Sequence, residues 1–239
     1  LKNKEIDLLV TAPINKLMIR KIEDGFIGHT EFLEKSFTGK ATMIMVSNVM
    51  KIAFVTGHLP FSKVISSITS KKIIEKAICF NKSLIVDFNI RKPKIAILGL
   101  NPHAGENGML GLEEEKIITP AVKELKEKNI LAFGPYASDS FFIPKNLHSF
   151  DGILALYHDQ GLIPFKALSF NEGVNYTSGL NIIRTSPVHG TAYEIAGKSL
   201  GDEGSFREAI FLALSIHKNR KNYTLLNESP LPIKRSPNK

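Results

Sequence analysis

Three histidines follow runs of apolar residues that have the length of β-strands. The runs are residues 52–55, 94–98 and 153–157, and the histidines are His58, His103 and His158. In open α/β sheets, ligands bind beyond the carboxyl ends of strands. Neutral imidazole is a common ligand of divalent metals. The spacing therefore predicts that the three side chains converge on one divalent metal ion, with open positions left for a substrate.

A second interpretation of the same histidines stays open. A single histidine is more often a structural or surface residue than a metal ligand, and separation along the chain does not guarantee that three strand ends meet. The pattern alone does not decide between the two.

Other residues indicate an anion site. Residues 28–33 (GHTEFL) have the pattern of a glycine turn entering a helix, with Thr30 as the N-cap. A helix N-terminus binds phosphate through its free backbone N–H groups. Lys166 and Arg184 each follow an apolar run and could supply a cation for phosphate or carboxylate. Taken singly, each of these features is more often an ordinary helix cap or a solvated charge than a binding group.

The elements that must position these residues alternate along the chain. Short apolar runs indicate strands at residues 6–10, 42–46, 52–55, 94–98, 153–157 and 181–184. Amphipathic stretches indicate helices at residues 63–80, 113–128 and 205–217, and the glycines of residues 105–111 indicate a loop. This order predicts an α/β protein with a mainly parallel or mixed sheet and flanking helices.

Composition is that of a globular chain. Of 239 residues, 43% are hydrophobic and 23% are charged, which is ordinary for such a protein. No apolar run reaches the roughly 20 residues that span a bilayer, and no signal-peptide pattern is present. Cys79, the single cysteine, lies in an apolar stretch and is expected to be buried in a helix. We therefore expect a cytoplasmic protein without a membrane partner.

The formal net charge of +8 favours anionic ligands. A nucleic-acid-binding protein would need a basic stripe interleaved with exposed aromatic residues, and the sequence has no such cluster, so we expect no nucleic-acid partner. The chain also lacks the G-x-G-x-x-G pattern of a Rossmann-type dinucleotide site, a Walker loop, zinc-finger spacing and a G-x-S-x-G elbow.

Five motifs in order give a more specific indication. They are residues 11–16 (TAPINK), 28–33 (GHTEFL), 100–106 (LNPHAGE), 157–166 (YHDQGLIPFK) and 189–197 (HGTAYEIAG). Together they resemble the family of 4-hydroxythreonine-4-phosphate dehydrogenases over essentially all of residues 6–215. The last motif is also similar to the adenosine-binding loop of isopropylmalate and isocitrate dehydrogenases. The resemblance implies a two-domain α/β fold of that dehydrogenase type.

The resemblance implies specific roles. The metal ligands would be His58, His103 and His158, holding one divalent ion per subunit (zinc, magnesium or cobalt) in an active site shared across a homodimer. The residues matching substrate-binding positions are His29, Thr30, Lys166, Asn175 and Arg184. Asp139 and Lys166 are the candidates for proton transfer.

The resemblance places the cofactor at the 189–197 motif. The residues expected to bind the adenosine end of NAD are His189, Gly190, Thr191, Ala192, Glu194 and Ile195. A carboxylate at Glu194 would accept a hydrogen bond from the ribose 2′-hydroxyl and repel a 2′-phosphate, which favours NAD over NADP.

The implied reaction is NAD-dependent oxidation, with decarboxylation, of 4-phosphooxy-L-threonine to 3-amino-2-oxopropyl phosphate in pyridoxal phosphate biosynthesis. Two alternatives stay open. A related dehydrogenase of four-carbon phospho-sugar acids, phosphoerythronate or phosphothreonate, would share these motifs. An inactive dimeric scaffold is the other alternative, because the family's N-terminal third, with its GDPAGIGPE motif, has no counterpart in the sequence.

The chain departs from the family at one further position, and the resemblance also implies how the chain divides into domains. The family often has an aspartate before the His-Gly-Thr-Ala block, where this chain has Val188. We expect residues 28–179 to form a metal-binding and dimerisation domain. Residues 1–27 plus 180–239 are expected to form part of a cofactor-side domain.

Overall fold

The computed structural model describes residue 1, residue 3, residues 5–23 and residues 28–229. Eight strands form one sheet in the order β1-β8-β7-β2-β3-β6-β4-β5. Their bounds are β1 Leu9–Val10, β2 Gly39–Val46, β3 Lys51–Phe54, β4 Lys94–Leu98, β5 Leu131–Tyr136, β6 Gly152–Ala155, β7 Val174–Leu180 and β8 Arg184–Pro187. Strands β3, β6, β4 and β5 are parallel neighbours, whereas β2 and β7 run antiparallel to the strands beside them. The predicted mixed sheet with flanking helices is confirmed.

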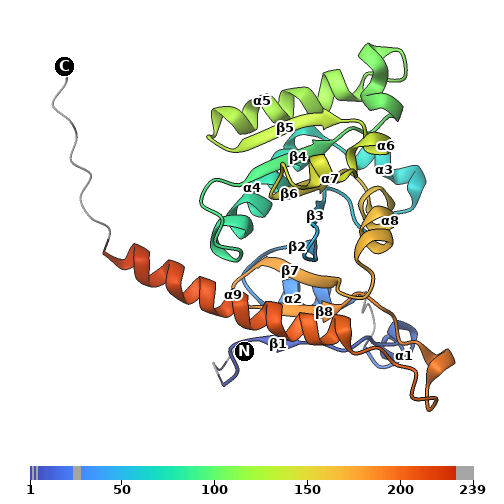
Figure 1. Ribbon diagram of the computed structural model, residues 1–239, viewed down its shortest axis with the longest axis vertical. Helices are drawn as coiled ribbons and strands as arrows, with labels where there is room; N and C mark the ends of the chain where they lie inside the picture. Colours follow the sequence, from blue (N-terminus) through green and yellow to red (C-terminus); the bar gives the residue numbers. More distant parts are fainter. Residues whose placement is uncertain (2, 4, 24–27, 230–239) are drawn as a thin grey trace.

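Helices cover both faces of this sheet (Figure 1). On one face lie α4 Ser70–Val86, α5 Thr119–Glu127 and α9 Gly204–Glu228, and on the other lie α6 Ser138–Phe141, α7 Pro144–Leu147 and α8 His158–Ser169. The alternation along each strand explains the two cores. Ile95 and Ile97 of β4 pack in the first core, while Ala96 and Leu98 pack in the second.

Shorter elements complete the chain. They are the helices α1 Lys16–Arg20, α2 His29–Ser36 and α3 Phe61–Ser67, the 3₁₀ segments η1 Pro102–Gly108 and η3 Tyr193–Ile195, and the π-helical turn η2 Glu114–Ile118. Asn15 begins α1, because its side-chain oxygen accepts hydrogen bonds from the backbone N–H groups of Leu17 and Met18 at 3.1 and 3.2 Å.

Several sequence-based boundaries were wrong. The helix predicted at 63–80 is two helices, because the backbone is extended at Ile68 and Thr69 and the Thr69 side chain caps α4 through the N–H of Lys72. The strand predicted at 6–10 is limited to β1, and the one predicted at 181–184 begins only at Arg184. Cys79 lies in α4 as expected, but it is only partly buried.

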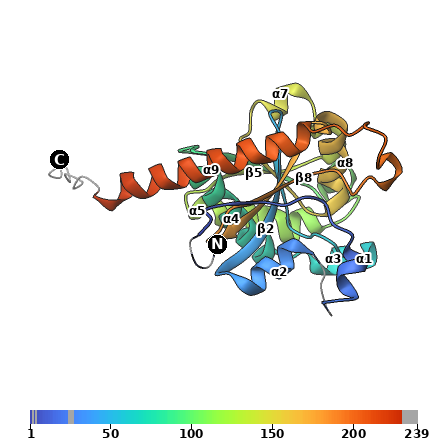
Figure 2. The same cartoon turned by 90° about the horizontal axis from the view of Figure 1, so that it is seen from below.

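The helix α9 crosses one end of the sheet and extends past its edge (Figure 2). It is anchored by Arg220, whose guanidinium donates to Asp87 Oδ1 at 2.7 Å and to the Tyr176 hydroxyl at 2.9 Å. Among the described helices, none is long and apolar enough to cross a membrane.

The domain division expected from the sequence stays a prediction. Strands from its two parts are hydrogen-bonded into one sheet, since β8 pairs with β7. Residues 24–27 and 230–239 of the cofactor-side part lie outside the described residues.

Candidate functional site

The parallel order of β3, β6 and β4 brings the segments after these strands to one edge of the sheet. His58 follows β3, and His158 is the first residue of α8, directly after β6. Their ring centroids are 5.2 Å apart. The structure therefore brings these two side chains together, and the two imidazoles form the centre of the candidate site.

The surroundings of the pair favour neutral imidazole at His58 and a fixed ring at His158. Desolvation lowers the pKa of His58, and the charges of Lys16 and His158 lower it further, while Glu31 opposes them. The Nδ1 atom of His158 lies 2.6 Å from Asp159 Oδ1. A carboxylate on one ring nitrogen leaves the other nitrogen available as a metal ligand. Both features fit a metal site.

His103 lies on a different kind of segment. It belongs to η1, in the part of the chain expected to be a loop, and its φ is 51°. The ring is 63% exposed, and its Nδ1 atom is 3.4 Å from Asp139 Oδ2. Asp139 follows β5, so the neighbouring parallel strands β4 and β5 deliver these two side chains together.

The three histidines do not form a single group within one chain. In the described part, no three His, Cys, Asp or Glu side chains are grouped closely enough to hold a metal ion. The structure brings His58 and His158 together, and His103 lies with Asp139 instead. The described side chains as placed therefore do not form a site of three imidazoles, and the metal site stays a prediction.

Gln160 connects the ends of several strands. Its Oε1 accepts from the N–H of Leu156 at 2.6 Å, and its Nε2 donates to the carbonyl of Gly99 and to Ser138 Oγ. These partners follow β6, β4 and β5, respectively. The amide is buried, so its bonds hold the segments that carry His158, His103 and Asp139 in a fixed relation.

Gln160→Leu should lower the free energy of unfolding by about 2–3 kcal/mol. The leucine has a similar volume but removes the acceptor of the Leu156 N–H and leaves the Gly99 carbonyl with only the longer bond from Ser138 Oγ, at 3.4 Å, among its described contacts. Each buried unsatisfied group costs about 1–3 kcal/mol. Urea unfolding monitored by circular dichroism measures the change. An unchanged midpoint would show that these hydrogen bonds are not needed to join the strand ends.

A buried guanidinium forms the second part of the site. Arg184 is 4% exposed and donates to Thr11 Oγ1 at 2.6 Å and to Thr177 Oγ1 at 3.2 Å. Burial lowers the pKa of Arg184 to about 10, so the group is still a cation at neutral pH. In the described residues, no carboxylate forms an ion pair with it. A buried cation with neutral partners is suited to an anionic ligand.

His29 lies beside this cation, with its Nδ1 atom 3.4 Å from Arg184 Nη2. Desolvation lowers the pKa of His29, and the charges of Arg184 and Lys16 lower it further. Thr30 is not the N-cap that the sequence predicted. Gly28 occupies that position, and Thr30 is the second residue of α2, because the chain turns into the helix one residue before the expected hydroxyl.

The charges of Lys16 and Glu31 act both on the histidine pair and on the residues around Arg184. Lys16 acts electrostatically on both His29 and His58, and Glu31 acts on both His58 and Arg184. The sequence motif 11–16 contained Thr11 and Lys16, but the pattern gave them no role. Both contact or influence the site because β1 runs beside β8, which begins with Arg184.

Asn175 presents an unused hydrogen-bond acceptor. Its Oδ1 atom is buried and has no hydrogen-bond partner within the described part of the chain. Asn175 is two residues from Thr177 on β7, so both side chains point to the same face of the sheet, and Thr177 contacts Arg184. A buried acceptor without a partner is costly unless a ligand donates to it. This feature supports the expected role of Asn175 in substrate binding.

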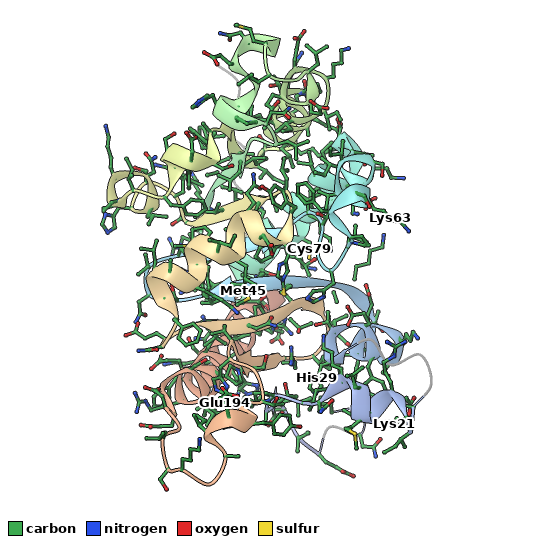
Figure 3. The ribbon with its side chains drawn as sticks, turned by 90° about the vertical axis from the view of Figure 1, so that its right-hand side faces the viewer. Lys21, His29, Met45, Lys63, Cys79 and Glu194 are labelled. Atoms are coloured by element: carbon green, nitrogen blue, oxygen red, sulfur yellow. The ribbon has the colours of Figure 1, made fainter. Side chains whose placement is uncertain are left out.

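The predicted cofactor loop lines a cavity of about 1000 Å³. The loop runs from His189 to Ile195, and Lys166 and Asn15 lie on the cavity wall. Glu194 is exposed there, and Asn15 donates to the Tyr193 hydroxyl at 3.3 Å. Figure 3 labels His29 and Glu194, both of which lie below α8 in that view. Lys166 is two turns along α8 from His158, a rise of about 12 Å.

Comparison with known proteins gives a consistent picture. The family model of "Pyridoxal phosphate biosynthetic protein PdxA" matches residues 1–213. A curated 4-hydroxythreonine-4-phosphate dehydrogenase of Bacteroides thetaiotaomicron is 51% identical over 228 residues, which cover 95% of this chain and 63% of that protein. The chain thus spans less than two thirds of the length of this relative.

Solved structures show the same similarity. The 4-hydroxythreonine-4-phosphate dehydrogenase of Klebsiella pneumoniae superimposes with a TM-score of 0.77 at 34% identity, covering 89% of this chain and 65% of that one. Isocitrate dehydrogenase from Methylococcus capsulatus superimposes with a TM-score of 0.55 at 13% identity, covering 89% of this chain and 69% of that one. The latter likeness concerns the fold alone.

Proposed function

Because the chain belongs to the PdxA family of dehydrogenases, we propose that it takes part in the NAD-dependent oxidation of 4-phosphooxy-L-threonine. In that reaction the substrate's secondary alcohol would give up a hydride to NAD⁺ and a proton to a base, which would leave a 3-oxo acid. That acid loses carbon dioxide and takes up a proton, giving 3-amino-2-oxopropyl phosphate. The observation that carries the proposal is the buried Arg184, which donates to the hydroxyls of Thr11 and Thr177 and forms no ion pair with a carboxylate among the described residues.

Arg184 would bind the substrate phosphate. The guanidinium is already desolvated and oriented by Thr11 and Thr177, and no carboxylate of the described residues is paired with it, so a phosphate would gain charge-assisted hydrogen bonds there. His29 and Thr30 at the start of α2 would add contacts to the same anion. Asn175 Oδ1 would accept from a donor of the substrate, such as its ammonium group. These contacts would fix the reacting carbon.

The residues that would hold a divalent metal ion are His58, His158 and His103. The first two are paired in one chain, and we propose that a second copy supplies His103, so that the active site is shared in a homodimer. When bound, a zinc, magnesium or cobalt ion would lower the pKa of the substrate hydroxyl. Asp139, beside His103, and Lys166, on the cavity wall, are the candidates for moving protons.

The cavity beside α8 would take the adenosine end of NAD. His189, Gly190, Thr191, Ala192 and Ile195 would surround it, and the Glu194 carboxylate would accept from the ribose 2′-hydroxyl. The cavity volume of about 1000 Å³ is adequate for such a ligand.

The test is NADH formation from 4-phosphooxy-L-threonine, measured at 340 nm after chelation and again after adding Zn²⁺, Mg²⁺ or Co²⁺. We expect turnover only with added metal and a preference for NAD over NADP. Turnover with phosphoerythronate or phosphothreonate instead would assign the same site to a related substrate. Absence of turnover with all three substrates would contradict the proposal.

A further inference from the structure

The segment that carries His103 has an unusual backbone. His103, Ala104, Glu106 and Asn107 have φ values of 51°, 52°, 41° and 56°, and Gly105 between them has 78°. Residues other than glycine rarely adopt this left-handed region, and successive ones almost never do. Such a conformation persists only when surrounding contacts hold it. The structure should therefore contain a group that fixes this segment.

That group is the carboxylate of Glu114. The side chain is 6% exposed. Its Oε1 accepts from the N–H groups of Leu100 and Asn101 at 2.7 and 2.8 Å, and its Oε2 accepts from Asn101 Nδ2 at 2.9 Å. Leu100 and Asn101 connect β4 to the His103 segment, so Glu114 holds the point from which the left-handed turn departs.

The segment also packs closely on this carboxylate. A Cβ atom at Gly105 would lie 2.7 Å from Glu114 Oε2, and only glycine avoids that contact. Glu114 itself is the first residue of the π-helical turn η2, which continues directly into α5. Turns of this kind are frequent at functional sites. The carboxylate thus projects from a rigid element into the base of the His103 segment.

We propose that Glu114 is a positioning residue that holds the His103 segment in its left-handed conformation and so places the His103 imidazole for metal binding. The inference rests on the proposed function, in which His103 is a metal ligand. Glu114 does not touch the metal; it acts through the backbone of Leu100 and Asn101. Groups that orient metal ligands typically contribute 10- to 100-fold to metal affinity, roughly.

Glu114→Gln tests this role in the full chain, with Co²⁺ alone as the probe. Glutamine keeps the shape, but its NH₂ group cannot accept from Asn101 Nδ2, and the negative charge is lost. We expect the Co²⁺ dissociation constant, measured by titration calorimetry, to rise about 10- to 100-fold. The matched control is Glu113→Gln, the adjacent carboxylate, which also accepts from Asn101 Nδ2 but is less buried and makes no bond to the backbone of Leu100 or Asn101 among the described residues. It should change the constant by less than about threefold.

His103→Ala distinguishes failure of the proposed metal site from failure of the positioning role of Glu114. If His103→Ala binds Co²⁺ as tightly as the unaltered chain, the proposed metal site is wrong and the inference falls with it. If His103→Ala weakens binding but folded Glu114→Gln does not, the metal site stands and the positioning role is overturned. A lowered unfolding midpoint with unchanged Co²⁺ affinity would likewise overturn it, because a merely structural role predicts that result.

Gly105→Ala is the second variant, should Glu114→Gln not fold. Its methyl group displaces the segment from the carboxylate and disfavours the φ of 78° while leaving Glu114 intact. We again expect weaker Co²⁺ binding, by at least about tenfold. A folded Gly105→Ala chain with unchanged affinity would contradict the proposal.

Discussion

Subunits carrying His158→Ala and subunits carrying His103→Ala should each be inactive, but their mixture should regain about a quarter of the unaltered NADH formation. In the proposed dimer each site takes His58 and His158 from one chain and His103 from the other. Random mixing makes half of the dimers hybrid, and one of the two sites in each hybrid then has all three imidazoles. Each variant alone should form NADH more than about a thousandfold more slowly than the unaltered chain, because the metal would supply the main stabilisation of the developing charge.

The structure supplies a matched control for this experiment. His58 and His158 are paired within one chain, with ring centroids 5.2 Å apart. A mixture of His58→Ala and His158→Ala subunits should therefore stay inactive, because every site in its hybrids lacks one member of the pair. Differently tagged subunits, co-expressed and purified on both tags, isolate the hybrids. Recovery in the control mixture, or none in the first, would contradict the shared site.

Arg220→Met should lower the free energy of unfolding by about 3–5 kcal/mol. Asp87 is 3% exposed and bonded to Arg220 Nε and to the Tyr176 hydroxyl, so removing the guanidinium leaves a buried carboxylate without its cation. Arg220 also donates to the carbonyls of Leu180 and Ile182, which would lose those donors. The variant should unfold at a lower urea concentration, as followed by circular dichroism.

Arg207→Met on the same helix provides the comparison. Arg207 pairs with Glu203 one turn away at 3.0 Å, but both side chains are more than half exposed. Such surface pairs contribute about 0.2–1 kcal/mol, so this variant should unfold close to the unaltered chain. Equal destabilisation by the two substitutions would mean that the Asp87 network contributes no more than a surface contact.

The strands that could be predicted from sequence share one property. Strands β2, β3, β4 and β6 are apolar on both faces, so each produces a continuous hydrophobic run. Strand β7 carries Asn175, Thr177 and Ser178, and β5 contains Gly134 and Pro135, so neither resembles a buried strand. Missing β5 also meant that Asp139 could not be placed at a strand end beside His103 from the pattern alone.

The candidate site was predictable only in part for a related reason. Sequence shows that a histidine follows a strand, but not which strands are neighbours. The order β3-β6-β4 decides that His58 meets His158, and the left-handed backbone after β4 decides that His103 meets Asp139. The contacts of Arg184 with Thr11 and of Glu114 with Leu100 depend on tertiary packing, which no local pattern encodes.

The helix α8 connects the histidine pair to the wall of the cavity. It starts at His158, in the histidine pair, and carries Lys166 on the wall of the cavity two turns later. A displacement of this helix therefore moves both groups at once. If a metal ion at the pair changes the affinity of the cavity for a dinucleotide, the dinucleotide must change the affinity for the metal by the same factor, because binding linkage is reciprocal.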